Sequence, residues 1–199
     1  GKSMVLAKEI DHWLVGDHPY QTIPKAPKIY CVSANYRTHQ MGIWSHLKTF
    51  LPEWEIDKLG PNVSGYILPS YVIMKNGAEC WFLSAVGVEE ARRMVQAAQL
   101  DLVVVDEEID AAIWQEIQMR LIAYEGRAIF GATLVISEPW ILDLDDRALA
   151  GDPEVEAFRF STYRAAEAGH VSKKKIKEIE TLCNDDDRAV RLLGKSRRS

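Results

Sequence analysis

The sequence lacks the long apolar runs, paired cysteines and histidine clusters that mark membrane, secreted and metal-binding proteins. Its longest apolar runs, such as residues 102–105, are far shorter than the ~20 residues that a membrane-spanning helix needs. The 3 cysteines show no C-x-x-C spacing and the 5 histidines no metal-ligand spacing, so we expect buried, reduced thiols and structural histidines in an intracellular protein. The chain starts with Gly1 and shows no charged-then-apolar leader, which predicts that it carries no signal peptide.

An excess of positive charge is also missing. The net charge of -5 argues against a generally basic nucleic-acid coat, although a local basic surface or another domain could still hold DNA. A late cluster of basic residues is interpreted as a solvated helix face and a terminal tail. Its members are Lys173, Lys174, Lys175, Lys177, Lys195, Arg197 and Arg198. Hydrophobic residues make up 47% of the chain, enough to bury the core of one domain with a small appendage.

What the sequence does contain is an alternation of helix-like and strand-like segments. Apolar periodicity predicts helices over 3–14, 39–51, 88–96 and 111–124, and strands over 29–34, 71–74, 80–83, 102–105, 128–135 and 158–163. Asn76-Gly77 predicts a hairpin whose turn has positive φ at both central residues. Two further helices are expected near the end, one beginning at Ser172 and one at the acidic run 185–187. The alternation predicts an α/β sheet with right-handed crossovers.

The first three residues carry the first chemical signal. Gly1-Lys2-Ser3 leads directly into a predicted helix and matches the end of the phosphate-binding loop G-x-x-x-x-G-K-[ST]. In such a loop the lysine neutralises the β and γ phosphates, the hydroxyl binds Mg²⁺, and the helix N-terminus adds a partial positive charge. Three residues alone are a weak signal, because Gly-Lys-Ser is common by chance.

A second signal strengthens the first. The apolar strand 102–105 runs directly into Asp106-Glu107-Glu108, and an acid at the carboxyl end of a buried strand lies where α/β sheets bind ligands. With Lys2 and Ser3 upstream, we assign Asp106 to Mg²⁺, held through coordinated water, and Glu107 to orienting and deprotonating the attacking water. The alternative is an acidic cap on the next helix, a role that we expect of Glu108 and Asp110.

A third signal is Gly131-Ala132-Thr133 in the strand predicted over 128–135. A hydroxyl at the carboxyl end of a strand can reach the γ-phosphate region and report its loss, so Thr133 is a candidate nucleotide contact. Taken alone, the segment is equally a strand that contains a threonine.

The order and the residue patterns of these segments resemble those of the large subunits of tailed-phage terminases, over nearly the whole chain. No single stretch is decisive, but the ordered set is fairly specific. The similar segments are the strand and turn at 29–37, the asparagine-glycine hairpin at 75–84, the approach to the Walker B strand at 96–108, the next helix at 116–121, the coupling motif at 132–134, and the segment joining motor to nuclease at 160–163, 171–172 and 191–194.

The resemblance implies a phosphate-loop NTPase of the RecA/helicase-like type, with a mainly parallel sheet and flanking helices over 1–163. Residues 164–199 would form a small helical lid or linker. It implies ATP and Mg²⁺ as cofactors, with Gly1, Lys2 and Ser3 in the phosphate loop. It also implies a hydrolase of the host cytoplasm that drives double-stranded DNA into a procapsid as a homo-oligomeric ring, with the portal protein and the small terminase subunit as partners and no membrane contact.

Motors of this family also use an arginine that reaches the γ-phosphate of a neighbouring subunit. Arg93 stands a short distance before the Walker B strand, as that residue would, and Arg92 and Arg37 are alternatives. A competing interpretation of Tyr36-Arg37 is that the pair lines the adenine side of the nucleotide. An exposed helix arginine without such a role is the competing interpretation of Arg93.

The resemblance also has departures. Family members often have Gly where Ala97 stands, and Asp-Asn-Pro where residues 164–166 stand. The family's first strand and glycine-rich loop would precede Gly1, and its RNase H-like nuclease domain would follow residue 199. Since consecutive backbone N–H groups of that loop hold the phosphates, we expect these 199 residues alone to bind ATP poorly and hydrolyse it negligibly.

Two alternatives remain open at this point. A helicase-like ATPase also ends its Walker B strand in Asp-Glu, but it needs a second motor domain, and the residues after Thr133 are too few and too helical for one. A non-catalytic remnant would fold and bind partners without turning over ATP.

Overall fold

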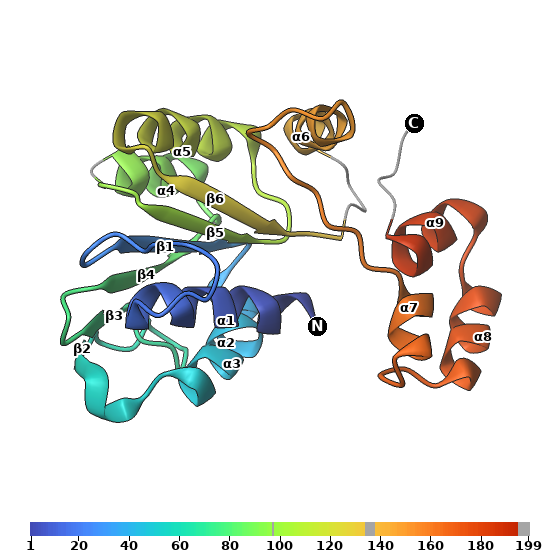
Figure 1. Ribbon diagram of the computed structural model, residues 1–199, viewed down its shortest axis with the longest axis horizontal. Coiled ribbons are helices and arrows are strands. Elements are labelled where there is room, and N and C mark those ends of the chain that lie inside the picture. Colours follow the sequence, from blue (N-terminus) through green and yellow to red (C-terminus); the bar gives the residue numbers. More distant parts are fainter. Residues whose placement is uncertain (97, 134–137, 195–199) are drawn as a thin grey trace. The chain divides into compact units, whose positions relative to one another are not determined.

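A computed structural model describes residues 1–96, 98–133 and 138–194 (Figure 1). The chain divides into two compact units, Gly1–Ala132 and Thr133–Ser199. The division falls earlier than the 163/164 boundary expected from the sequence. No helix in the described ranges is long and apolar enough to cross a membrane.

A six-stranded sheet forms the centre of the first unit, in the order β2-β3-β4-β1-β5-β6 (Figure 1). Four neighbouring strands, β4, β1, β5 and β6, are parallel, while β3 and β2 continue the sheet antiparallel. The predicted α/β fold with a mainly parallel sheet is therefore confirmed. The strands are β1 (Lys28–Ser33), β2 (Ile56–Leu59), β3 (Tyr71–Met74), β4 (Glu79–Ser84), β5 (Leu102–Asp106) and β6 (Arg127–Gly131).

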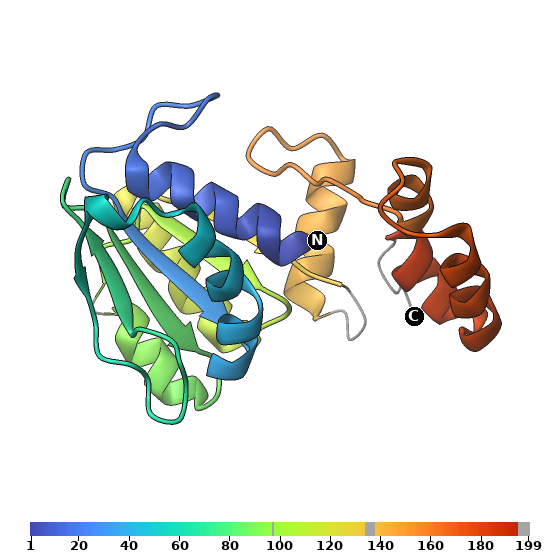
Figure 2. The ribbon, with the colours of Figure 1, turned by 90° about the horizontal axis from the view of Figure 1, so that it is seen from below.

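Helices cover both faces of this sheet, as Figures 1 and 2 show. One face carries α1 (Lys2–Val15), α2 (Tyr36–Met41) and α3 (Ile43–Phe50), and the other carries α4 (Val88–Gln96) and α5 (Ala111–Tyr124). A short 3-10 turn, η1 (Glu53–Glu55), leads from α3 into β2. The crossover connections between the parallel strands place helices on both faces and so produce three layers.

All five residues of the central strand β5 are buried. Leu102 and Val104 pack into the core under α1 and α3, where Ile10, Leu14 and Leu47 meet them. Each fully buried side chain of this kind stabilises the fold by about 1.5–3 kcal/mol. The continuous apolar run therefore predicts the strand correctly, and both faces are covered, as in other parallel sheets.

Strand register brings polar residues to one edge of the sheet. Ser33 at the end of β1 pairs with Asp106 at the end of β5 and with Ser84 at the end of β4. Asp106 in turn pairs with Gly131, the last residue of β6. Four parallel strands thus end level with one another, which is where α/β sheets bind ligands.

Two local predictions need correction. The helix expected over 39–51 is two helices, because the chain breaks at Gly42, whose φ of -96° and ψ of -102° are not helical. The hairpin between β3 and β4 is confirmed, but its turn is not of the predicted type. Only Gly77 has positive φ (88°), and its N–H bonds to the carbonyl of Met74, as in a type I turn followed by a glycine bulge.

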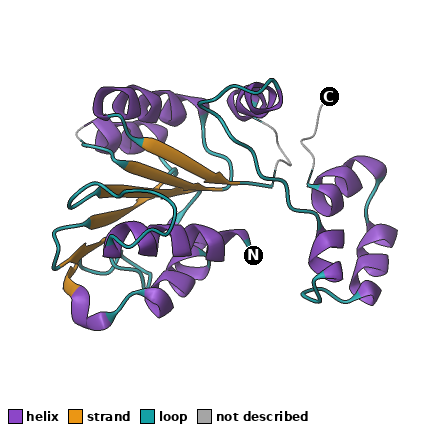
Figure 3. Ribbon diagram, in the orientation of Figure 1, coloured by secondary structure: helices purple, strands orange, loops and turns teal. Residues whose placement is uncertain are grey.

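The second unit contains four helices and no strand among its described residues (Figure 3). The strand predicted over 158–163 is wrong. Ser161 instead caps α7 (Thr162–Glu167), its hydroxyl accepting a hydrogen bond from the N–H of Arg164. Helix capping of this kind outweighs the strand-like aromatic pattern before it.

The other helices of this unit are α6 (Pro139–Leu149), α8 (Lys173–Leu182) and α9 (Asp185–Leu193). Ser172 caps α8 as predicted, accepting from the N–H of Lys175, and α9 begins at the acidic run. Helix α6, which begins with Pro139 in its first turn, was not predicted. The strand expected over 128–135 ends at Gly131, and residues 134 and 135 lie outside the described part of the chain.

Candidate functional site

The N-terminus of α1 lies at the carboxyl end of β5. Gly1 precedes the helix, and its carbonyl accepts hydrogen bonds from Met4 and Val5, at 3.1 and 3.3 Å. The hydroxyl of Ser3 is 3.4 Å from Oδ2 of Asp106, a long and therefore weak hydrogen bond between residues 103 positions apart in the chain. The two motifs that the sequence singled out thus come together in the fold.

The same helix end carries a second link between the motifs. Nζ of Lys2 forms an ion pair with Oε1 of Glu107 at 3.0 Å, and the two side chains are 38% and 42% exposed. Because both partners remain open to water, the pair itself contributes little to stability. Its importance is positional, since it places Lys2, the predicted phosphate-binding lysine, beside the predicted catalytic base.

Glu107 adopts an unusual backbone conformation. Its φ of 70° lies in the left-handed region, which costs a residue with a Cβ roughly 1–3 kcal/mol. Its N–H donates to the carbonyl of Gly131 on β6, at 3.2 Å, which helps to hold this turn immediately after the strand. Strained backbone of this kind concentrates at functional sites, and here it turns the chain sharply between Asp106 and Glu107.

Asp106 is buried, with only 2% of its surface exposed. Burial raises the pKa of its carboxyl group, and the negative charge of Glu107 raises it further, while Lys2 and the hydrogen bond from Ser3 lower it. The net shift is upward, so the nearby lysine does not fully compensate the buried negative charge. A cation at this carboxylate would therefore be favoured.

Gly42, between α2 and α3, approaches the same pair of oxygens. A Cβ at this position would lie 3.1 Å from Oδ2 of Asp106, 3.4 Å from Oγ of Ser3 and 2.8 Å from the carbonyl oxygen of Thr38. A side chain here would crowd Oδ2 of Asp106 and Oγ of Ser3, and it would clash with the backbone carbonyl oxygen of Thr38. The break between the two helices thus keeps the space beside Ser3 and Asp106 open.

Replacing Gly42 by Ala is expected to lower the free energy of unfolding by about 1–3 kcal/mol, since overpacking against backbone forces a shift. The same Cβ should weaken Mg²⁺-dependent nucleotide binding, because it intrudes on Ser3 and Asp106. Urea unfolding and titration calorimetry measure the two effects. Met41→Ala, at an adjacent exposed position, is the control. Unchanged Mg-ATP affinity in Gly42→Ala would show that the nucleotide does not need this space.

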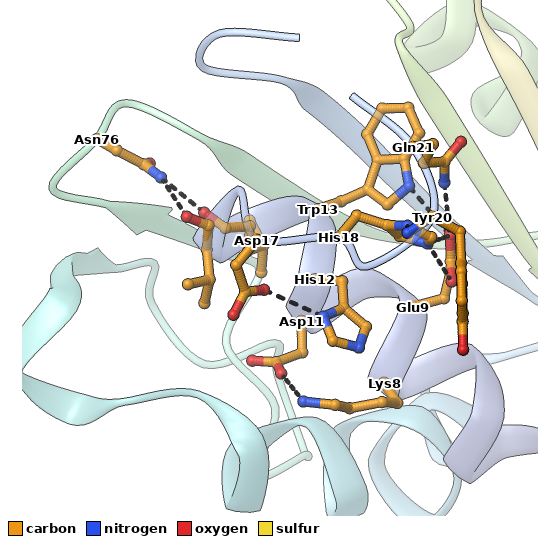
Figure 4. Close-up of polar contacts among 12 residues, drawn as sticks. Lys8, Glu9, Asp11, His12, Trp13, Asp17, His18, Tyr20, Gln21 and Asn76 are labelled. Atoms are coloured by element: carbon orange, nitrogen blue, oxygen red, sulfur yellow. Dashed lines mark hydrogen bonds and ion pairs between the residues drawn. The ribbon is translucent and has the colours of Figure 1, made fainter. Parts of the chain in front are cut away.

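Hydrogen bonds at the far end of α1 fix the helix in place (Figure 4). The carboxylate of Glu9 contacts the side-chain nitrogens of Trp13, His18 and Gln21, at 3.1–3.2 Å. The Asn76 amide donates to the carbonyl of Leu14 at 2.8 Å, tying the helix to the β3–β4 turn. With its C-terminal half held in this way, α1 presents Lys2 and Ser3 in a defined position.

His39 anchors α2, the helix that ends at Gly42. Its Nε2 donates to the carbonyl of Leu83 at 2.7 Å, so its Nδ1 accepts from the Ser33 hydroxyl at 3.1 Å. Burial lowers the pKa of His39 to about 4, the Leu83 carbonyl partly opposing it, so the ring is neutral near pH 7. The prediction of structural histidines holds here, but the contribution of His39 and Gly42 to the site was missed, because both act only through tertiary contacts.

The donor set fits Mg²⁺. In the described ranges no group of three or more His, Cys, Asp or Glu side chains could hold a metal by itself. Mg²⁺ usually keeps several waters and is held by one or two carboxylates together with substrate phosphates. Two hard oxygen ligands suit that arrangement, the Ser3 hydroxyl and the Asp106 carboxylate, whose negative charge Lys2 offsets only in part. Both lie beside the space that Gly42 leaves open.

The remaining predicted site residues, Arg93 and Thr133, lie on other parts of the chain. Arg93 is exposed on α4, which packs against α5. Its neighbour Arg92 pairs instead with Glu89, at 3.0 Å. Thr133 is the first residue of the second unit, two positions after the end of β6. The roles suggested for Arg93 and Thr133 stay predictions.

The predicted acidic helix cap is confirmed at one of its two residues. The side chain of Asp110 accepts a hydrogen bond from the N–H of Ala112 at 2.7 Å and forms the N-cap of α5. Asp106 and Glu107 are not part of that cap. Instead they face Ser3 and Lys2.

Comparison with known proteins gives a likeness in structure only. No protein-family model matches the sequence, and no curated protein matches it. The fold is similar to a crystal structure of the large terminase from a thermophilic bacteriophage, with a TM-score of 0.73 at 10% identity, over 98% of this chain and 45% of that one. A second crystal form of the same protein matches with a TM-score of 0.63 at 11% identity, over 98% of this chain and 44% of that one.

A third structure of the same thermophilic-phage terminase was determined in complex with ADP. It matches with a TM-score of 0.58 at 10% identity, over 86% of this chain and 41% of that one. The chain therefore spans less than half the length of the terminase structures that it matches. It has the fold that the sequence resemblance implied, a mixed α/β sheet like that of these terminases.

Proposed function

We propose that this chain is the ATP-hydrolysing motor segment of a viral terminase large subunit that drives double-stranded DNA into a procapsid. The observation that carries the proposal is the meeting of Lys2 and Ser3 with Asp106 and Glu107 at the carboxyl end of β5. A fold like that of phage large terminases supports the choice of this motor among phosphate-loop ATPases. ATP and Mg²⁺ are the proposed cofactors, and the phage terminase crystallised with ADP is consistent with the first.

Lys2 and Ser3 bind and orient the nucleotide in this proposal. Lys2 lies in the first turn of a 14-residue helix, where the partial positive charge of the helix end favours phosphate. It neutralises the β and γ phosphates. The Ser3 hydroxyl and the Asp106 carboxylate would hold Mg²⁺. The ion would supply positive charge that offsets the negative charge developing on the phosphates.

Glu107 is the general base. It accepts a proton from the water that attacks the γ-phosphorus, the bond from that phosphorus to the β–γ bridging oxygen breaks, and ADP and inorganic phosphate are released. Its side chain is 42% exposed, so water can reach it. Lys2 pairs with Glu107 in this structure, and the phosphates of a nucleotide compete for that lysine. Nucleotide binding thereby frees the base at the moment when it is needed.

The wider roles remain proposals that rest on the resemblance. Thr133 couples loss of the γ-phosphate to DNA movement, and Arg93 reaches the nucleotide of a neighbouring subunit in a homo-oligomeric ring. Double-stranded DNA, the portal protein and the small terminase subunit are the proposed partners, in the host cytoplasm. Residues 164–199 are interpreted as the helical lid or linker toward a nuclease domain.

A Lys2→Ala substitution tests the nucleotide site. We expect Mg-ATP affinity of the full-length gene product to fall by about tenfold, which is the lower range for losing a hydrogen bond to a charged group at a partly exposed position. Titration calorimetry measures this, with Lys48→Ala on an exposed part of α3 as the control. Equal affinity in both variants would contradict the proposed site. Normal binding by the parent protein without any turnover would instead favour a non-catalytic remnant.

A further inference from the structure

A hollow separate from the Lys2–Asp106 cluster opens beside the carboxyl ends of β1 and β4. Its volume is about 250 Å³, and residues from four elements line it. Asn35 and Tyr36 belong to the start of α2, Tyr66 to the β2–β3 connection, Ser84 to the end of β4, and Glu90 and Met94 to α4. None of the proposed nucleotide-site residues lines it.

The size of the pocket limits what it can hold. A volume of 250 Å³ corresponds to roughly eight water molecules. Pockets for drug-sized ligands or cofactors are larger, at about 300–1,000 Å³. The pocket therefore suits one side-chain-sized group rather than a whole nucleotide. Because Glu90 is exposed at its rim, the rest of such a ligand would remain outside.

The lining favours positive charge. The rings of Tyr36 and Tyr66 lie 6.1 Å apart, inclined at 50°. Burial raises the pKa of the Tyr36 hydroxyl, and the negative charge of Glu90 raises it further, while a backbone hydrogen bond from Ser84 lowers it. The Glu90 carboxylate therefore interacts electrostatically with one of the two tyrosines that line the pocket. Aromatic faces and a carboxylate together attract ammonium and guanidinium groups. Among the described residues, no lysine or arginine forms an ion pair with Glu90.

Two acceptor atoms of the lining are already used within the fold, so the charge of the pocket comes from Glu90. Oδ1 of Asn35 accepts from the N–H and the hydroxyl of Thr38, at 2.9 and 3.2 Å, and caps α2. Oγ of Ser84 accepts from the N–H of Val86 at 3.2 Å. The negative charge of Glu90 would repel phosphate or carboxylate ligands. The chemistry of the pocket is thus that of a cation site.

We propose that this pocket receives the guanidinium or ammonium group of a single arginine or lysine side chain presented by a partner protein. The charged group sits against Tyr36 and Tyr66 and pairs with Glu90, while the ligand's backbone stays at the surface. The same α2 that opens the pocket at Tyr36 ends at Gly42, beside Ser3 and Asp106. A ligand in the pocket therefore contacts the helix that borders the proposed nucleotide site.

The test is an NMR titration of the 199-residue chain with N-acetyl-arginine amide. We expect saturable shifts confined to the pocket, with a dissociation constant of about 1–10 mM for so small a ligand. The lysine analogue should bind similarly and the neutral glutamine analogue should not. Glu90→Gln should weaken binding at least fivefold. Glu89→Gln, at the neighbouring exposed acid that pairs with Arg92, should not change it.

Three outcomes would overturn the proposal: no saturable shifts with the arginine analogue, equal binding of the glutamine analogue, or no effect of Glu90→Gln. Tighter binding of the free diamine putrescine than of the arginine amide would assign the pocket to small polyamines instead of a protein partner. Lys2→Ala should leave this titration unchanged, so the pocket can fail or hold independently of the proposed ATPase function.

Discussion

Glu107→Gln is expected to reduce ATP turnover by the full-length gene product about 100-fold or more while leaving Mg-ATP binding near normal. The amide has the same shape as the carboxylate and still accepts a hydrogen bond, but it cannot take the proton of the attacking water. The observed position supports this assignment, because Glu107 contacts Lys2 and stands directly after Asp106. Steady-state phosphate release and calorimetric titration measure the two quantities.

Two features of the structure sharpen this experiment. Glu108→Gln, at the adjacent acid, changes the charge equally and should retain most of the turnover. Glu107→Gln also removes the ion pair with Lys2, so affinity for ATP should be equal or slightly higher, because phosphates no longer compete with a carboxylate for that lysine. Equal turnover in Glu107→Gln and the parent protein would remove Glu107 from the mechanism, whatever its effect on binding.

The central sheet and the polar edge at which its parallel strands end were largely predictable from the sequence. A run of four apolar residues that is followed by acidic residues is typical of a buried parallel strand whose carboxyl end lies at a ligand site. The approach of Ser3 to Asp106 follows from that rule, since a phosphate-loop helix begins at the same edge. The side-chain pair between Lys2 and Glu107 could not be predicted, because it depends on the positive φ of Glu107.

Other features were not predictable because long-range contacts decide them. The helical periodicity of 39–51 continues through Gly42, and the closeness of Asp106 and Ser3 to that glycine is a long-range contact that the sequence pattern does not show. The aromatic alternation before Ser161 resembles a strand, but the described part of the second unit contains no other strand with which it could form backbone hydrogen bonds. Local capping by Ser161 then decides in favour of a helix.

Asp106→Asn is expected to act in opposite directions on stability and on metal binding. Without Mg²⁺, burial and the charge of Glu107 raise the pKa of Asp106, so the ionised carboxylate is unfavourable in the fold and the neutral amide should stabilise it near pH 7. With Mg²⁺, loss of this carboxylate should weaken ion-dependent nucleotide binding by about 10–100-fold, the usual cost of removing a group that orients metal ligands. Urea unfolding and calorimetry separate the two effects.

The pH dependence gives this prediction its sign. A carboxyl group whose pKa is raised by folding binds its proton more tightly in the folded state, so its unfavourable contribution disappears as the pH falls through that raised pKa. The stability gained by Asp106→Asn should therefore be largest near pH 7 and shrink toward acidic pH. A variant that is less stable than the parent at pH 7 without Mg²⁺ would mean that Lys2 and Ser3 already compensate the charge. Asp106 would then be a structural residue rather than a carboxylate waiting for a cation.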